Sequence, residues 1–383
     1  MGRRLILLVF LCLTLVLALF FPKVWERAAG LQESLPPGID APRQRLLRVW
    51  VVEDTLSASP WLRRQAARME NAYEGVSVYL RTAQAWELTQ TGTVLPDLVL
   101  FGPGAIRDPE GLFIPLAAEF PLPGGAMRAG RFKQTHYAVP VCLDGYALVY
   151  DPALTGAAAA TPAPTPLLGI GASPAQTAAP EDAVSFGELQ AALAKVPREK
   201  TAVCDFQCAA GMPLLLFTAL SGGRANLPAD AVSKNFANIS SGAAYTEFLA
   251  GRCRAAVLLS AGLSSLARQK KPFALLALPL PATDRYLAAG ILQGGEAELA
   301  LVYLTALLSD EGQGDLKQSG LFAVSQTVLL YAADPVFGRV EESLRGDAIL
   351  PNAFSYDGQT LQSLSRSAFS NNGSVFEILE SIR

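Results

Sequence analysis

Predicted strands alternate with helical segments near the start of the chain, and this order constrains the fold more than any other feature. Residues 46–52 and 96–101 are apolar runs typical of buried strands, and residues 76–80 alternate apolar and polar positions. Ser59-Pro60 begins a helical pattern, and residues 83–91 favour a second helix. Strands that alternate with helices predict a parallel sheet with crossover helices. Such sheets bind ligands at the carboxyl ends of their strands.

A second α/β pattern follows a low-complexity stretch rich in Ala, Pro and Thr at residues 155–184. Helical periodicity in 186–196, a strand at 201–206 and a strand at 255–259 indicate another sheet with helices, and we expect a helix from Ser264. The tail after residue 325 is expected to be mostly helical. With 383 residues and 51% apolar composition, the chain has material for two to three domains and cannot be mainly disordered.

The N-terminal segment is predicted to direct the chain to a membrane. Arg3 and Arg4 precede an apolar run from Leu5 to Phe21, as in a secretory signal or an N-terminal anchor. We favour an uncleaved anchor at residues 1–30 followed by a spacer at 31–44, with a cleaved signal as the alternative. The positive end should stay inside, which places the remainder at the extracytoplasmic face of the membrane, or outside the cell if the signal is cleaved.

Charge and motif content exclude several classes of function. The net charge is −3, so no basic field favours nucleic acid. His136 is the only histidine, which excludes a multi-histidine metal centre. No nucleophile-elbow, zincin, Walker A or dinucleotide-binding motif occurs. We therefore expect a protein that is not an enzyme and needs no cofactor or metal.

Four cysteines outside the N-terminal run could form disulfides if the protein is exported. They could pair in three ways, or be small buried apolar side chains. A bond between neighbouring cysteines in the 204–208 loop would fix the polar residues between them. The four residues are Cys142, Cys204, Cys208 and Cys253, and the possible disulfide joins Cys204 to Cys208.

The order of these segments resembles the extracellular solute-binding proteins of ABC transporters, in the large family that binds sugars and oligosaccharides. Each matching piece is short, and the likeness rests on their order and spacing. The pieces are Leu-Arg-Val-Trp at 47–50, residues 67–78, Leu-Pro-Asp-Leu-Val at 95–99, Tyr-Ala-Val-Pro-Val at 137–141, residues 147–154, Ser-Phe-Gly-Glu-Leu at 185–189, residues 299–313 and residues 320–325.

The resemblance implies a periplasmic-binding-protein type II fold: two α/β lobes joined by crossing strands, with a ligand cleft between them. Lobe 1 would comprise 45–143 and 281–325, and lobe 2 would comprise 144–280 and 326–383. The protein would be a monomer that captures a small solute, with carbohydrate favoured, by lobe closure and delivers it to an ABC-transporter permease. The alternative is a non-transport interaction or sensory protein with the same fold.

Candidate ligand contacts are polar, aromatic and glycine residues near strand ends. A carboxylate can accept hydrogen bonds from ligand hydroxyls, a ring can stack on a sugar, and glycine lets the backbone approach. A helix N-terminus can hold oxygen atoms. Each candidate also has a structural interpretation, such as core packing or strand termination. The predicted ligand-binding residues are Asp54, Trp61, Gly102, Gly104, Asp144, Tyr146, Asp205, Gln207, Ser260, Gly262, Tyr286 and Gly290.

The distribution of tryptophan departs from the family pattern. All four tryptophans lie before residue 87, so only Phe and Tyr could stack on a sugar from lobe 2. Either the ligand is not a large sugar, or the binding function has changed.

Overall fold

The computed structural model describes most of the chain after residue 43. Two compact units are formed, Met1–Arg45 and Leu46–Arg383. The first lies almost wholly outside the described residues, as do the predicted anchor, most of the spacer and most of the 155–184 stretch. In the part that is described, no helix is long and apolar enough to cross a membrane. The described residues are 44–54, 56–90, 92, 94–117, 120–156, 186–193, 195, 202–204, 244–269, 271–276, 283–345 and 350–357.

The first sheet has five strands, mixes parallel and antiparallel pairs, and contains all three strands predicted near the start of the chain. Continuous apolar sequence makes its central strands fully buried. The pair β1 and β3 is parallel, with Val49 opposite Leu98, while β11 runs antiparallel to β3 and β6. In spatial order the strands are β2 (Val76–Ala83), β1 (Arg45–Val52), β3 (Leu98–Phe101), β11 (Tyr286–Ile291) and β6 (Val139–Leu143).

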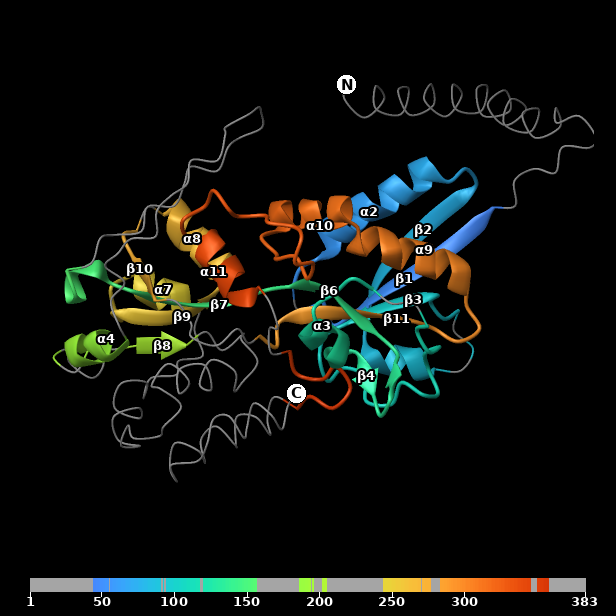
Figure 1. Cartoon of the computed structure of the whole chain (residues 1–383), viewed down its shortest axis with the longest axis horizontal. Coiled ribbons are helices and arrows are strands. Elements are labelled where there is room, and N and C mark those ends of the chain that lie inside the picture. The colour runs from blue at the N-terminus through green and yellow to red at the C-terminus, as the bar shows by residue number, and fades with distance from the viewer. Residues whose placement is uncertain are drawn as a thin grey trace, which may run out of the picture. The chain divides into compact units, whose positions relative to one another are not determined.

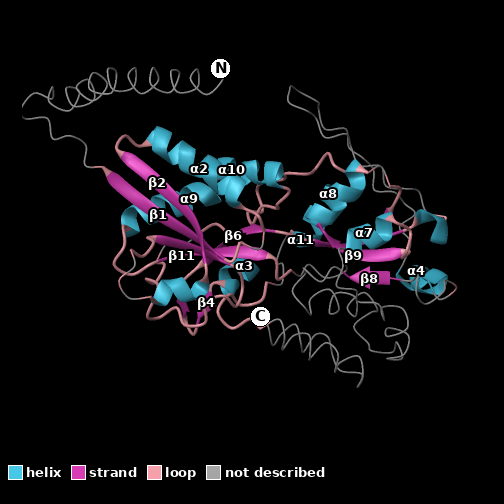
Figure 2. Cartoon of the chain, turned by 180° about the vertical axis from the view of Figure 1, so that it is seen from behind, coloured by secondary structure: helices cyan, strands magenta, loops and turns pink. Residues whose placement is uncertain are grey.

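Helices cover the first sheet on one side. Figures 1 and 2 show α2 (Ser59–Ala72) and α9 (Ala297–Leu308) on this side, with α3 (Gly124–Ala129) and β4 (Arg131–Phe132) on the other. The first helix begins at Ser59-Pro60, as the sequence predicts, and buries Leu62, Ala66 and Met69. The remaining elements of this part are η1 (Ala85–Thr89), β5 (Thr135–His136), α10 (Asp310–Gly314) and η4 (Asp315–Ser319).

The second sheet has four strands and its own helices. Its strands in spatial order are β10 (Ala274–Leu276), β7 (Tyr146–Tyr150), β9 (Ala255–Leu259) and β8 (Ala202–Cys204). Its neighbours in the chain are η2 (Pro152–Leu154), α4 (Phe186–Leu193), α7 (Ala244–Leu249), α8 (Ser260–Arg268) and α11 (Phe337–Leu344). The pair β8 and β9 is parallel, whereas β7 runs antiparallel to β9 and β10.

Three segments of the chain lie side by side where it passes between the two sheets. Leu143 and Phe322 form an antiparallel bridge, with N–H to O distances of 3.0 and 2.9 Å. The N–H of Asp144 donates to the carbonyl of Arg285 at 2.7 Å. The connections after β6, before β11 and after η4 are therefore hydrogen-bonded to one another.

Two segments differ from expectation. Helix α8 begins at Ser260 rather than Ser264, because the N–H of Ser260 finds an acceptor in the carboxylate of Asp144. After residue 325 the described part contains a single helix, α11. The second segment is 326–383, which we expect in lobe 2. Helix α11 and strand β7 line a common pocket in that lobe. Residues 350–357, in contrast, hydrogen-bond to elements around the first sheet.

Candidate functional site

Asp284 is the acceptor at the centre of a buried cluster where the chain passes between the sheets. The hydroxyl of Tyr146, on β7, donates to Oδ1 of Asp284 at 2.5 Å. The hydroxyl of Tyr356 donates to Oδ2. All three side chains are buried. One carboxylate therefore joins the second sheet, the segment before β11 and the C-terminal segment.

Asp144 is the second carboxylate of this cluster. Its Oδ1 accepts from the N–H of Gly145 at 2.8 Å and from the N–H of Ser260, the first residue of α8, at 3.4 Å. We predicted that the start of α8 would hold oxygen atoms of a ligand. The position is instead occupied by the protein's own carboxylate, as helix electrostatics favours. The carbonyl of Asp144 also accepts from the Thr283 hydroxyl at 2.7 Å.

Burial raises the pKa of both acids. It raises the pKa of Asp144 and of Asp284 above the usual range, although hydrogen bonds and the nearby Arg285 guanidinium lower each pKa in part. Tyr356 is also buried, and the pKa of its hydroxyl is raised by burial and by the neighbouring carboxylate. A buried acid between two tyrosine hydroxyls is suited to holding segments together. We call Asp144, Tyr146, Asp284 and Tyr356 the crossing cluster.

The loop after β3 is covered by residues 350–357. The N–H of Gly104 donates to the carbonyl of Ala353 at 2.7 Å, and its φ is +80°. A Cβ at Gly104 would lie 2.4 Å from the carbonyl oxygen of Tyr356, so only glycine fits. Phe354 packs its ring near Phe101, at a centroid distance of 5.7 Å. The predicted contact Gly104 therefore faces a segment of this chain, whereas Gly102 accepts a hydrogen bond from the N–H of Ala105 within the same loop.

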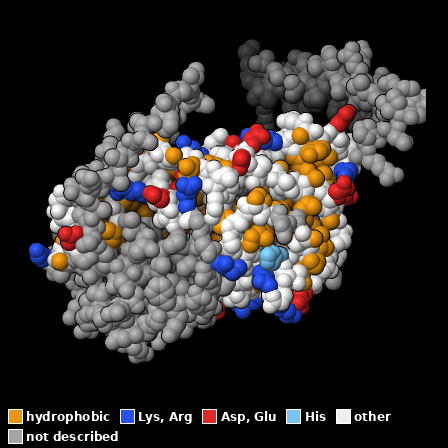
Figure 3. All heavy atoms as spheres, in the orientation of Figure 1, with side chains coloured by type: hydrophobic (Ala, Val, Ile, Leu, Met, Phe, Trp, Pro, Cys, Tyr) orange, Lys and Arg blue, Asp and Glu red, His pale blue; other side chains and the backbone are white. Residues whose placement is uncertain are grey.

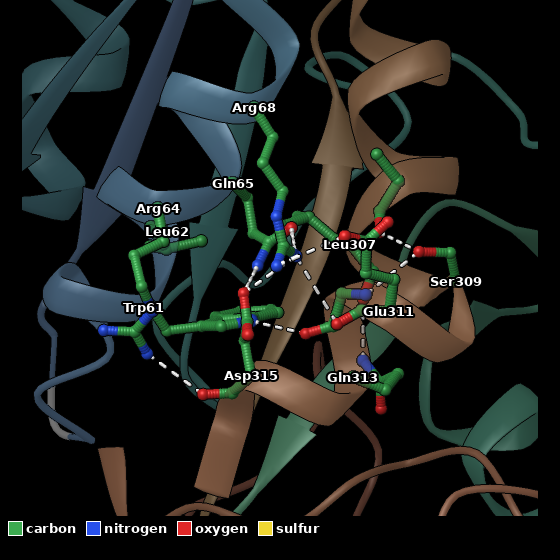
Figure 4. Close-up of polar contacts among 12 residues, drawn as sticks. Trp61, Leu62, Arg64, Gln65, Arg68, Leu307, Ser309, Glu311, Gln313 and Asp315 are labelled. Atoms are coloured by element: carbon green, nitrogen blue, oxygen red, sulfur yellow. Dashed lines mark hydrogen bonds and ion pairs between the residues drawn. The ribbon is translucent and has the colours of Figure 1, made fainter. Parts of the chain in front are cut away.

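Trp61, a predicted ligand contact, lies in the core. It is completely buried, and its indole Nε1 donates to the carbonyl of Gly312 at 2.8 Å (Figure 4). Asp54 is engaged at the start of the same helix. Its oxygens accept from the N–H of Ala58 at 3.1 Å and from the hydroxyl of Ser59 at 3.0 Å. Trp61 and Asp54, both predicted as ligand contacts, therefore hold α2 in place.

Three further candidates are packing residues. The hydroxyl of Tyr286, which is completely buried, donates to the carbonyl of Pro351 at 2.5 Å. A Cβ at Gly290 would lie 3.1 Å from the ring of Phe113. Gly262 lies within α8 against the side chain of Leu258. In this structure all three are packed against other parts of the chain.

The predicted loop between the cysteines lies outside the described residues. Asp205, Gln207 and Cys208 are there, and only the backbone of Cys204, at the end of β8, is described. The Cys204–Cys208 disulfide therefore stays a prediction. Cys142 and Cys253 are free and buried, and burial raises the pKa of Cys253 to about 12. Neither is poised as a nucleophile.

The structure brings together four of the predicted residues and adds others. Asp144, Tyr146, Ser260 and Tyr286 all lie where the chain passes between the sheets. Sequence reasoning missed Asp284 and Tyr356. The run Thr283-Asp284-Arg285 directly before a buried strand could have indicated Asp284, whereas nothing in the sequence around Tyr356 indicates its partner.

The described part contains a small pocket beside the crossing cluster and no metal centre. A pocket between α11 and the second sheet, lined by residues that include Tyr146, Leu276 and Arg339, has room for about one water molecule. No group of three or more His, Cys, Asp or Glu side chains in the described residues could hold a metal ion. Figure 3 shows hydrophobic side chains exposed over the first-sheet part of one face.

Comparison with known proteins establishes the fold. No protein-family model and no curated protein matches the sequence. Among solved structures, the chain is similar to the GacH receptor of Streptomyces glaucescens GLA.O, with a TM-score of 0.57 and 13% identity over 88% of this chain and 96% of that chain. That receptor was solved unliganded and in complex with acarbose and an acarbose homolog. The predicted bilobal α/β fold of solute-binding proteins is thereby confirmed.

Proposed function

We propose that this protein captures a small solute, of the carbohydrate class, between its two lobes. The observation that carries the proposal is the match in fold to a receptor solved with acarbose, which extends over nearly the whole of both chains. Proteins of this fold close on a ligand because it contacts both lobes, and the ligand stabilises the closed form by its differential affinity.

We further propose that the protein acts at the extracytoplasmic face of the membrane, as a monomer anchored by its N-terminal segment, and delivers the solute to an ABC-transporter permease. The apolar run from Leu5 to Phe21 after Arg3 and Arg4 supports this location. A gene deletion that abolishes uptake of one sugar would test delivery. Unchanged uptake of every sugar that the purified protein binds would contradict it.

A second candidate is a non-transport interaction or sensory protein on the same scaffold. One observation favours it: residues 350–357 cover the loop after β3, where we expected ligand. A partner that is a kinase or an envelope-assembly protein, with no effect of deletion on sugar uptake, would distinguish this candidate.

Ligand binding can be tested directly with the full-length protein in detergent. We expect acarbose or an oligosaccharide to raise the unfolding temperature, and a ligand at 100 times its Kd should stabilise by about 2.7 kcal/mol. Titration calorimetry gives the Kd, with glycerol and amino acids as comparison solutes. No stabilisation by any of a broad panel of mono- and oligosaccharides would contradict the carbohydrate proposal.

A further inference from the structure

Trp86 is an exposed aromatic side chain in a chain that buries its other described tryptophans. It is 60% exposed, whereas Trp50 is 2% exposed and Trp61 is not exposed at all. A large apolar ring left in water forgoes hydrophobic stabilisation that burial would provide. Trp86 is not among the predicted ligand contacts, and none of the contacts described above uses its ring.

The turn that carries Trp86 is held firmly. In η1, Gln84 and Glu87 form a reciprocal capping box, with the N–H of Gln84 donating to Oε1 of Glu87 at 2.8 Å. Arg81 forms an ion pair with Glu87 and places its guanidinium 4.6 Å from the ring centroid of Trp50. Leu88 is buried in the core. The turn is therefore anchored on both sides of Trp86, and the exposed ring is presented by a fixed backbone.

Trp86 lies just beyond the carboxyl end of β2. The N–H of Glu53, just after β1, donates to the carbonyl of Ala83, the last residue of β2, at 3.1 Å. The carboxyl ends of β1 and β2 therefore meet, and Trp86 follows β2 by three residues. Open α/β sheets bind ligands outside this edge.

The neighbouring loop after β1 carries backbone strain. Glu53 and Ser57 both have left-handed conformations, with φ of 51° and 55°. Such conformations cost about 1–3 kcal/mol in residues other than glycine and cluster at functional sites. This strain is a second feature of the same edge.

We propose that Trp86 is a stacking platform for an outer ring of an oligosaccharide bound at this edge. The inference rests on the proposed function and makes it specific: the ligand is a chain of sugars long enough to reach the end of β2, not a single sugar. An exposed indole face matches the apolar face of a pyranose. Trp86 belongs to the first lobe. Its ring would therefore add stacking to whatever Phe and Tyr provide from the second lobe, which has no tryptophan.

The test compares Kd values for glucose and for maltose-series oligosaccharides in the full-length protein, Trp86→Ala, Trp86→Phe and Tyr79→Ala. Tyr79 is a matched control because it is an exposed ring, at 53%, within β2 rather than beyond its end. Stacking of aromatic groups predicts an approximately two- to ten-fold weaker oligosaccharide affinity for Trp86→Ala. Trp86→Phe should lose less oligosaccharide affinity than Trp86→Ala. The affinity for glucose should not change in these variants, and Tyr79→Ala should bind oligosaccharides as wild type does.

Fluorescence supplies a readout independent of affinity. In a Trp25→Phe background, saturating oligosaccharide should shift tryptophan emission to the blue and protect it from iodide quenching. Both effects should vanish with Trp86→Phe. If wild type and Trp86→Ala bind oligosaccharides with equal affinity, this inference is wrong and the proposed function stands. The same holds if Trp86→Ala weakens the affinity for glucose as much as the affinity for oligosaccharides. If wild type binds no sugar, both fail.

Discussion

Two polar clusters in this molecule use similar groups in opposite environments. The α2–α10 cluster comprises Trp61, Gln65, Arg68, Glu311 and Asp315 with their contacts, and its charged groups reach the surface (Figure 4). In the crossing cluster, both carboxylates are buried and accept from hydroxyl and N–H groups. Water screens charges in the first cluster and is excluded from the second.

This difference determines which groups stabilise the fold. In the α2–α10 cluster, the side-chain exposure is 41% for Arg68 and 77% for Glu311, so their attraction is weak. The strong element there is the buried ring of Trp61. In the crossing cluster, removing a donor leaves a buried oxygen without a hydrogen bond. The free energy of unfolding then falls by the full desolvation penalty of that oxygen. One cluster therefore depends on apolar packing, and the other depends on satisfied hydrogen bonds.

The largest effect should follow from removing Trp61. Trp61→Ala should lower the free energy of unfolding by about 3–5 kcal/mol, because a fully buried ring leaves a cavity and Gly312 loses its donor. Urea unfolding followed by circular dichroism measures this change. Trp61→Phe should recover part of it.

The matched control for Trp61 is Trp86, which is the exposed tryptophan of the described part. Trp86→Ala should stay within about 0.5 kcal/mol of wild type. Equal losses at Trp61 and Trp86 would show that burial does not determine the contribution of these rings.

Asp284→Ala should come next, at about 2–4 kcal/mol of lost stability, because the hydroxyls of Tyr146 and Tyr356 would both lose their acceptor. Asp284→Asn keeps the shape and one oxygen, and should lose less. The double variant Tyr146→Phe/Tyr356→Phe in the Asp284→Leu background should recover stability, because no polar group is then left unpaired. Stability of Asp284→Ala equal to wild type would contradict the role of this acceptor.

The pH dependence of stability should also separate the clusters. The pKa of Asp284 is raised in the folded state from its ordinary value of 3.8, so the folded protein binds its proton more tightly than the unfolded chain. The contribution of this proton is present below pH 3.8 and is lost as the pH rises through the folded pKa. Relative to Asp284→Asn, wild type should therefore become less stable as pH increases above about 4.

Urea midpoints of both proteins across this pH range measure that difference. A constant difference would mean that Asp284 keeps its ordinary pKa. Arg68→Ala, which removes a side chain that is 41% exposed, should show no such trend against wild type.

The strands were predictable from sequence, whereas the crossing cluster was not. Residues 46–52 and 96–101 are so continuously apolar that a buried strand is the simplest solution, and β1 and β3 confirm it. Asp284 meets Tyr146 across 138 positions and Tyr356 across 72 positions. Local pattern carries no information on which distant hydroxyl reaches a carboxylate, so this part of the candidate site required the fold.

Trp61 illustrates the same limit on a helix. The spacing of Leu62, Ala66, Met69 and Tyr73 predicts one buried face. The first three are buried, whereas Tyr73 follows the end of the helix and is 48% exposed. The spacing does not predict that α10, which lies 251 positions along the chain at Gly312, covers a second face and buries Trp61. An aromatic residue at the edge of a predicted face is therefore ambiguous between ligand contact and core until its distant partner is known.

The smallest effect should come from the partly exposed ion pair between Arg68 and Asp315, whose side chains are 41% and 15% exposed. Their nitrogen–oxygen distance is 2.8 Å, and Gln65 also donates to Asp315 at 2.9 Å, so Asp315 keeps a partner when Arg68 is removed. Arg68→Ala should cost about 0.2–1 kcal/mol in dilute buffer and almost nothing in 1 M salt, where the Debye length is about 3 Å. A double-mutant cycle with Asp315→Ala measures the pair itself. A coupling energy as large as the loss in Asp284→Ala, undiminished by salt, would show that the α2–α10 cluster excludes water as the crossing cluster does.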